Sequence, residues 1–104
     1  MSGGNSGGYI PSPTTKFDCQ NGEILTRLSN IDPDVLNQHQ VGNVLDVSII
    51  DNSVVVENEN GEILGSILHI NVSELKECIE GGNDYSAEII EIINSICRVK
   101  ISII

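Results

Sequence analysis

Isoleucine is the residue that most constrains what this chain can fold into. The sequence contains seventeen isoleucines and a single alanine, Ala87, and its three aromatic residues are Tyr9, Phe17 and Tyr85. β-Branched side chains lose rotamer freedom in a helix but pack well on a pleated sheet. We therefore expect a mainly β (α+β) domain with an aliphatic core. The length of 104 residues fits one domain with a core of modest size.

Residues 1–15 differ in composition from the rest of the chain. They contain four glycines, three serines and two prolines. Such a segment cannot bury enough apolar surface to offset the entropy that it would lose on ordering. We predict that residues 1–15 are a disordered tail or linker, and that residues 16–104 form a single β-barrel-like domain.

Short apolar runs separated by turn residues predict seven strands. The hairpin signal Asn21-Gly22 joins the first two, and Gly65 indicates a bulge or a close backbone approach within the fifth. The last strand alternates apolar and polar residues with the period of two that is typical of a half-buried strand. The predicted strands are residues 17–19, 23–28, 44–49, 54–57, 63–68, 85–93 and 96–104.

Two helical segments interrupt these strands. Asp32 followed by Pro33 is typical of a helix start and predicts a short helical turn near residues 33–38. Asn71 and Glu74 have the spacing of a capping box and predict an α-helix near residues 72–80. Consecutive short antiparallel strands with one helical plug indicate a small, partly open antiparallel β-barrel.

The three cysteines indicate a reducing environment. An odd number of cysteines at long, irregular spacings is not a disulfide framework. Cys78 lies on the apolar stripe of the predicted helix and Cys97 on the apolar face of the last strand, so we expect both in the core. The N-terminal residues lack a signal-peptide pattern, and no apolar run is long enough to span a bilayer. We expect a cytoplasmic protein with no membrane association.

The charge and the motifs restrict the functions that are open to this chain. Fifteen acidic and five basic residues give a net charge of −10, which disfavours nucleic acid and suits a cationic partner. The sequence shows no calcium loop, zinc motif, nucleophile elbow or phosphate loop. We therefore predict no catalytic, cofactor-binding or metal-binding residues, the alternative being a site assembled only in three dimensions. Arg98 and Lys100 share one face of the last strand, which is either a nucleic-acid contact or a solvated outer face.

From Val41 onward the chain resembles the HIRAN-type domains, small barrels found beside helicases and nucleases and also alone in bacteria. Three stretches carry the resemblance: residues 51–56, an acidic turn running into a valine strand; residues 60–67, a turn followed by a glycine-containing strand; and residues 75–87, a helix that ends in Gly-Gly before an aromatic residue. The resemblance implies an SH3-like or OB-like barrel that captures DNA ends. The chain departs from the family at residues 47–50, where an Asn-Pro-aromatic sequence is usual, and in its few basic and aromatic residues.

Together these features predict a non-catalytic binding or accessory module. We expect a protein partner or self-association, because the surface is acidic, the tail is flexible and no chemistry is apparent. The apolar end of the last strand, Ile103-Ile104, can also pair with another chain. The alternative is a divergent HIRAN-type domain that binds DNA ends through Arg98 and Lys100.

Overall fold

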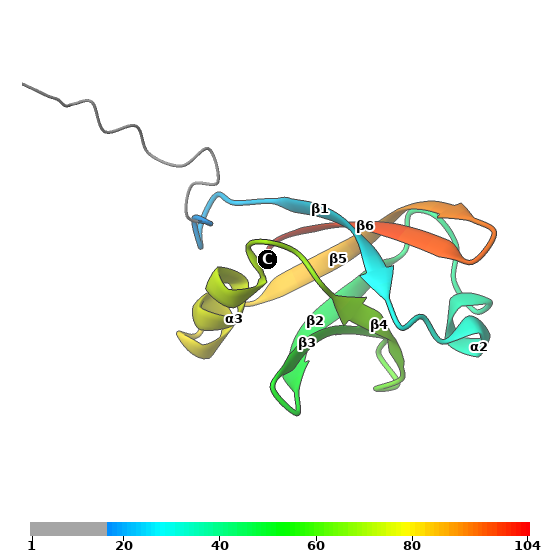
Figure 1. Ribbon diagram of the computed structural model, residues 1–104, viewed down its shortest axis with the longest axis horizontal. Helices are drawn as coiled ribbons and strands as arrows, with labels where there is room; N and C mark the ends of the chain where they lie inside the picture. Colours follow the sequence, from blue (N-terminus) through cyan, green and yellow to red (C-terminus); the bar gives the residue numbers. More distant parts are fainter. Residues whose placement is uncertain (1–16) are drawn as a thin grey trace, which may run out of the picture.

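The computed structural model describes residues 17–104, which form a closed six-stranded antiparallel barrel with two short helices (Figure 1). The predicted tail, residues 1–15, lies outside the described residues. The expected small antiparallel β-barrel is confirmed, and it is closed rather than partly open. In chain order the elements are β1 (Ile24–Ser29), α2 (Pro33–Leu36), β2 (Val44–Ile50), β3 (Ser53–Glu57), β4 (Ile63–Ile67), α3 (Val72–Glu80), β5 (Tyr85–Ile93) and β6 (Ile96–Ile103).

The first strand closes the barrel. Around the barrel the strand order is β1-β4-β3-β2-β5-β6, so β1 has neighbours on both sides. Its residues Ile24 to Arg27 pair with β6, and the next two residues, Leu28 and Ser29, pair with β4. This change of partner lies at the bend of β1 in Figure 1. The pairing of β1 with β4 comprises two residue pairs, against eight between β5 and β6, and we call it the seam.

Gly65 of β4 lies directly beside the seam. A Cβ atom at this position would lie 2.9 Å from the carbonyl oxygen of Ser29 and 3.1 Å from the Cβ atom of Leu28. The close backbone approach predicted from a glycine inside a strand is therefore confirmed. The bulge that the sequence offers as the alternative is present too: from Val56 to Glu57 of β3 the partner changes from Gly65 to Ile63, so the extra residue of β4 is adjacent to Gly65.

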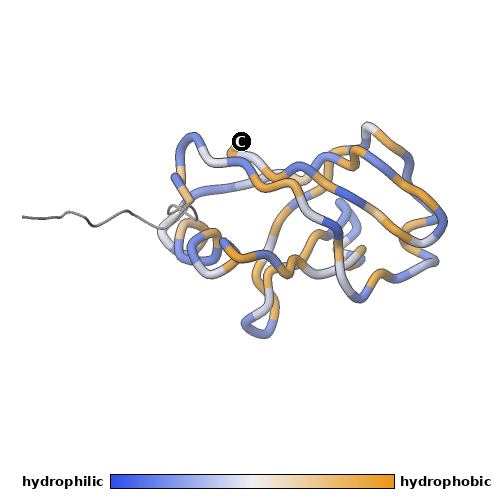
Figure 2. The backbone as a smooth tube through the Cα atoms, turned by 45° about the horizontal axis from the view of Figure 1, so that its top comes forward, coloured by the Kyte–Doolittle hydropathy of each residue, from blue (hydrophilic) through white to orange (hydrophobic). Residues whose placement is uncertain are grey.

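The core is aliphatic, as the isoleucine content predicts. Figure 2 shows hydrophobic residues interspersed with hydrophilic ones along the strands, and in β6 the apolar residues that alternate with polar ones point into the barrel. Tyr85 is the one aromatic residue among the fully buried side chains of the described part. The largest fully buried aliphatic side chains are Ile24, Leu64, Ile67, Leu75, Ile89 and Ile101.

Both helices lie where the sequence predicts them. The Asp32 side chain caps α2 by accepting hydrogen bonds from the backbone N–H groups of Asp34 and Val35, at 2.9 and 3.3 Å. Asn71 occupies the N-cap position of α3, although its side chain makes no capping hydrogen bond. Gly82 follows the helix end with φ of +105°, a conformation that favours glycine.

The strand and hairpin predicted at residues 17–22 are wrong. These residues form a turn in which the Gly22 N–H donates to the Asp18 carbonyl at 2.7 Å. The Asp18 carboxylate also accepts from the backbone N–H of Gln20 at 2.9 Å. An aspartate that bonds to the backbone two residues on stabilises a turn at the expense of a strand, so β1 has no partner from this segment.

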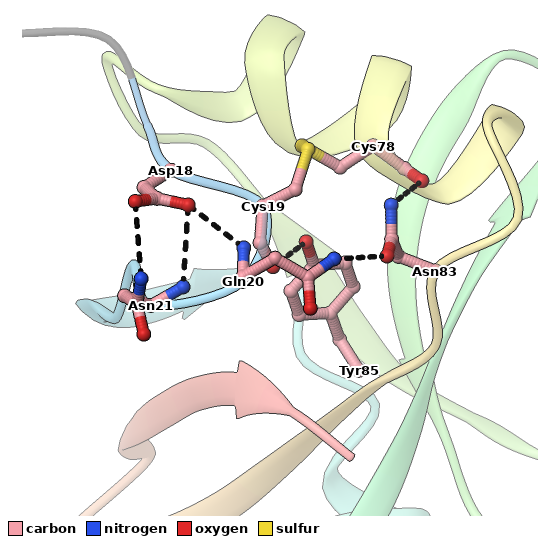
Figure 3. Close-up of a disulfide and its surroundings, with 7 residues drawn as sticks. All are labelled: Asp18, Cys19, Gln20, Asn21, Cys78, Asn83 and Tyr85. Carbon is pink, nitrogen blue, oxygen red and sulfur yellow. Dashed lines mark hydrogen bonds between the residues drawn. A yellow bond between two sulfur atoms is a disulfide. The ribbon is translucent and has the colours of Figure 1, made fainter.

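The prediction that the cysteines are unpaired is also wrong. Cys19 and Cys78 form a disulfide across 59 residues of sequence, joining the N-terminal turn to α3 (Figure 3). The third cysteine, Cys97, is free and fully buried, as predicted for a core residue. Cys78 is buried too, but as half of a disulfide.

None of the helices within residues 17–104 has the length and apolar character that crossing a membrane requires.

Candidate functional site

Arg98 and Lys100 point away from the core on β6, as the alternation predicts. Both are half-buried and alternate with the fully buried Cys97, Val99 and Ile101. Arg27 of β1 lies directly opposite Arg98, and all three cations are on the outer face of the barrel. We call Arg27, Arg98 and Lys100 the basic face, which holds three of the four lysines and arginines in the described residues.

Sequence reasoning missed Arg27. Its position in a strand of alternating burial indicates an outward side chain, but the pairing of β1 with β6 is what brings it to Arg98. The two strands are separated by most of the chain, so no local signal predicts their register. Two like charges directly opposite each other are unfavourable, and an anionic group beside them relieves this repulsion.

Two carboxylates of β5 lie along the same face. Glu88 is in register with Lys100 and Glu91 with Arg98. The Arg98 guanidinium lies 3.5 Å from the Glu91 carboxylate, and both side chains are about 40% exposed, so this ion pair contributes little stability. It is the only ion pair within residues 17–104, which leaves Arg27 and Lys100 without a carboxylate partner there. The basic face thus carries three cations and two anions.

A surface groove of about 590 Å³ adjoins Arg27 at the end of the barrel that carries α2. It lies between the end of β1, α2 and the turn that joins β5 to β6, and we call it the α2 groove. Figure 1 shows α2 and this turn at the same end of the barrel, opposite α3. Its apolar lining residues are Leu28, Ile31, Pro33, Leu36, Leu68 and Ile96.

The α2 groove has a buried floor and exposed apolar walls. Leu28 and Leu36 are below 10% exposed, whereas Leu68 is 68% exposed and Ile96 is 42% exposed. Large apolar side chains that stay open to solvent beside a groove are typical of interaction sites. Among the lining residues that the structure describes, Arg27 is the one charged side chain, and none is a carboxylate.

Each histidine is held by a hydrogen bond to the backbone. His39 is half-buried, with its Nδ1 atom 2.9 Å from the Val35 carbonyl oxygen. His69 is half-buried and its Nδ1 accepts from the Asn71 N–H at 3.1 Å. Within the described part of the chain, no three metal-ligating side chains gather in a cluster.

Two buried side chains have raised pKa values. Burial raises the pKa of the Cys97 thiol, which keeps it protonated and unreactive. Burial, and secondly the Asp18 carboxylate, raise the pKa of Tyr85. The Tyr85 hydroxyl is therefore a neutral donor, and it bonds to the Cys19 carbonyl at 2.7 Å.

Comparison of the chain with models of protein families, with curated proteins and with solved structures found no significant match to any of them. The resemblance to HIRAN-type domains therefore stays a prediction.

Proposed function

We propose that this chain is a non-catalytic binding module that holds a segment of a protein partner in the α2 groove. The observation that supports it is the groove lining, in which exposed Leu68 and Ile96 flank a buried apolar floor beside Arg27. Although the chain has a net charge of −10, the described part of this lining contains a cation and no carboxylate.

The lining also defines the chemistry of the partner. An apolar side chain that covers Leu68 and Ile96 is removed from water, which is the main source of affinity in such sites. A carboxylate beside Arg27 gains a charge-assisted, bidentate hydrogen bond. The preferred partner is an extended segment in which an apolar residue is close to an aspartate, a glutamate or a C-terminal carboxylate.

Selection from a library of displayed random peptides tests this proposal. We expect the selected peptides to combine an apolar residue with an acidic group. The Leu68→Ser variant should no longer bind these peptides. Ile70→Ser is the matched control, because Ile70 is also 68% exposed and lies two residues away, but outside the groove. Arg27→Gln should weaken the binding of acidic peptides more than that of peptides without an acidic group.

Three results would count against the partner segment. Failure to select any peptide, or selection of basic peptides, contradicts the chemistry derived from the lining. Equal loss in Leu68→Ser and Ile70→Ser contradicts the location. A dimer in sedimentation that Leu68→Ser dissociates would replace the partner by a second copy of the chain.

Binding of DNA ends is a second candidate, and the position of Arg27 opposite Arg98 favours it. Together with Lys100 these arginines offer three cations to a phosphate backbone, although Glu88 and Glu91 lie along the same face. This function predicts binding of single-stranded ends that weakens steeply with salt. NMR titration with an oligonucleotide at low salt should shift β1 and β6 resonances, and Arg98→Glu should abolish the shifts. Unchanged spectra would remove this candidate.

A cytoplasmic location also belongs to the proposal, and the Cys19–Cys78 disulfide bears on it. Disulfides persist in oxidising compartments, whereas in the cytoplasm they are usually transient or redox-sensing. Trapping of thiols by alkylation in intact cells, followed by mass spectrometry, reports which cysteines are oxidised. A cytoplasmic protein is expected to show a mixture of reduced and oxidised Cys19.

A further inference from the structure

The disulfide between Cys19 and Cys78 opens onto a cavity at the end of the barrel opposite the α2 groove. The cavity has a volume of about 240 Å³, and both cysteines line it together with Phe17, Glu74 and Glu77. Cys19 is half-buried, whereas Cys78 is 5% exposed. A small thiol that enters this cavity therefore reaches the sulfur of Cys19 first.

Few other contacts hold the N-terminal turn once the disulfide is removed. Figure 3 shows the Tyr85 hydroxyl donating to the Cys19 carbonyl, and the Gln20 side-chain amide donating to the Asn83 Oδ1 atom at 3.0 Å. The rings of Phe17 and Tyr85 lie 5.8 Å apart at an angle of 54°. Residues 17–22 belong to no strand, so their release does not break the hydrogen-bonded barrel.

We propose that Cys19–Cys78 is a thiol–disulfide exchange site, and that its reduction by a dithiol releases residues 17–22 from α3 and Tyr85. A thiolate of the reductant attacks the sulfur of Cys19. The bond between the two sulfurs breaks, and its electron pair leaves on the sulfur of Cys78, which takes up a proton. The second thiol of the reductant then displaces Cys19, which leaves as a thiol, and the reductant becomes a disulfide.

The exchange is reversible because the third cysteine is buried and cannot compete for either sulfur of the disulfide. Cys97 is fully buried in β6, and its burial raises the pKa of its thiol. It can neither attack the disulfide nor form a mixed disulfide while the barrel is folded. Cys19 and Cys78 are thus the only exchanging pair within residues 17–104.

The carboxylates of the cavity select the class of reductant. Glu74 and Glu77 both line it, and among residues 17–104 no cation does. They repel an anionic thiol as it approaches the disulfide. We therefore expect an uncharged dithiol or monothiol to react faster than an anionic thiol of similar size.

Hydrogen exchange of the full chain, with and without dithiothreitol, tests the release. On reduction we expect the amides of residues 18–22 and 83–85 to lose their protection, whereas those of β2 and β3 stay protected at the lower level that the loss of the disulfide's contribution to global stability sets. Cys97→Ser should respond like the wild type. Cys19→Ser should show the released state already in the absence of reductant, and adding dithiothreitol should not change it.

Several outcomes would overturn the proposal. The protein purified without reductant could contain three free thiols, or dithiothreitol could open the disulfide only in denaturant. Reduction could also leave residues 18–22 unchanged, or it could unfold the whole barrel. The reductant class has its own test in the ratio of rates for mercaptoethanol and mercaptoethanesulfonate. The ratio should favour mercaptoethanol and fall in Glu77→Gln, and a ratio that Glu77→Gln leaves unchanged contradicts the role of this carboxylate. None of these results depends on the α2 groove, so they test the exchange site separately from the proposed function.

Discussion

Replacement of Gly65 by alanine should destabilise the barrel at its seam. The added Cβ atom would lie 2.9 Å from the carbonyl oxygen of Ser29, a residue of the seam, and this backbone atom cannot rotate away. Overpacking of this kind costs about 1–3 kcal/mol. Each weakened seam hydrogen bond adds about 1 kcal/mol. Alanine also restricts the unfolded chain, which stabilises the folded state by about 0.4–1 kcal/mol. The free energy of unfolding should therefore fall by about 2 kcal/mol relative to the wild type.

Gly81→Ala is the matched control for this prediction. Gly81 also has a negative φ, of −79°, so alanine restricts the unfolded chain equally at both positions. Its added Cβ atom would lie 3.3 Å from the Glu77 carbonyl oxygen, a tight contact that the end of a helix accommodates by a small shift. Since that restriction is the same in both variants, they differ by the overpacking and hydrogen-bond costs, about 3 kcal/mol. We therefore expect the midpoint of thermal unfolding of Gly65→Ala to be about 12–24 °C below that of Gly81→Ala, at about 4–8 °C per kcal/mol. Equal midpoints for the two variants would refute the close approach at the seam.

Three further predictions concern the disulfide and two buried side chains. Cys19→Ser should lower the free energy of unfolding by about 4 kcal/mol in urea denaturation, since the disulfide closes a loop of 59 residues; a loss below about 1 kcal/mol would contradict this entropy argument. Cys97 should not react with a thiol reagent in the native protein and should react once in urea, and a fast native reaction would contradict its burial. The pKa of Tyr85 is raised above its ordinary value of 10.0, so its contribution to stability is complete below pH 10.0 and is lost as the pH rises through the folded-state value. Denaturant midpoints should therefore fall above pH 10.0 in the wild type and fall less in Tyr85→Phe, and parallel curves would exclude Tyr85 as the cause.

The elements that the sequence predicts correctly are those with local causes. The Asp32-Pro33 start of α2 depends on a side chain and the two residues after it, and the alternation along β6 depends on the period of a strand. The hairpin between β2 and β3 turns at Asp51 and Asn52, which adopt the positive φ angles that such turns require. Each of these is determined within a few residues, so one sequence is enough.

The N-terminal turn shows where local reasoning fails. Asn21-Gly22 is a hairpin signal, but Asp18 satisfies the backbone of Gln20 before a strand can form, and Cys19 is held by a residue 59 positions away. Counting cysteines led to the expectation of free thiols, because three is an odd number. The count does not reveal that one of them, Cys97, is placed in the core by the alternation of β6 and leaves the other two to pair.

The candidate site depends on the same long-range pairing. Arg98 and Lys100 share a face because they are two residues apart in one strand, and that much follows from the sequence. Arg27 joins them because β1 runs beside β6, and it borders the α2 groove because β1 then leaves β6 for β4. Closure of the barrel by its first strand therefore produces both the cation pair and the groove beside it. A variant that opens the seam, such as Gly65→Ala, should accordingly weaken peptide binding at the α2 groove before it unfolds the domain, whereas Gly81→Ala should leave that binding unchanged.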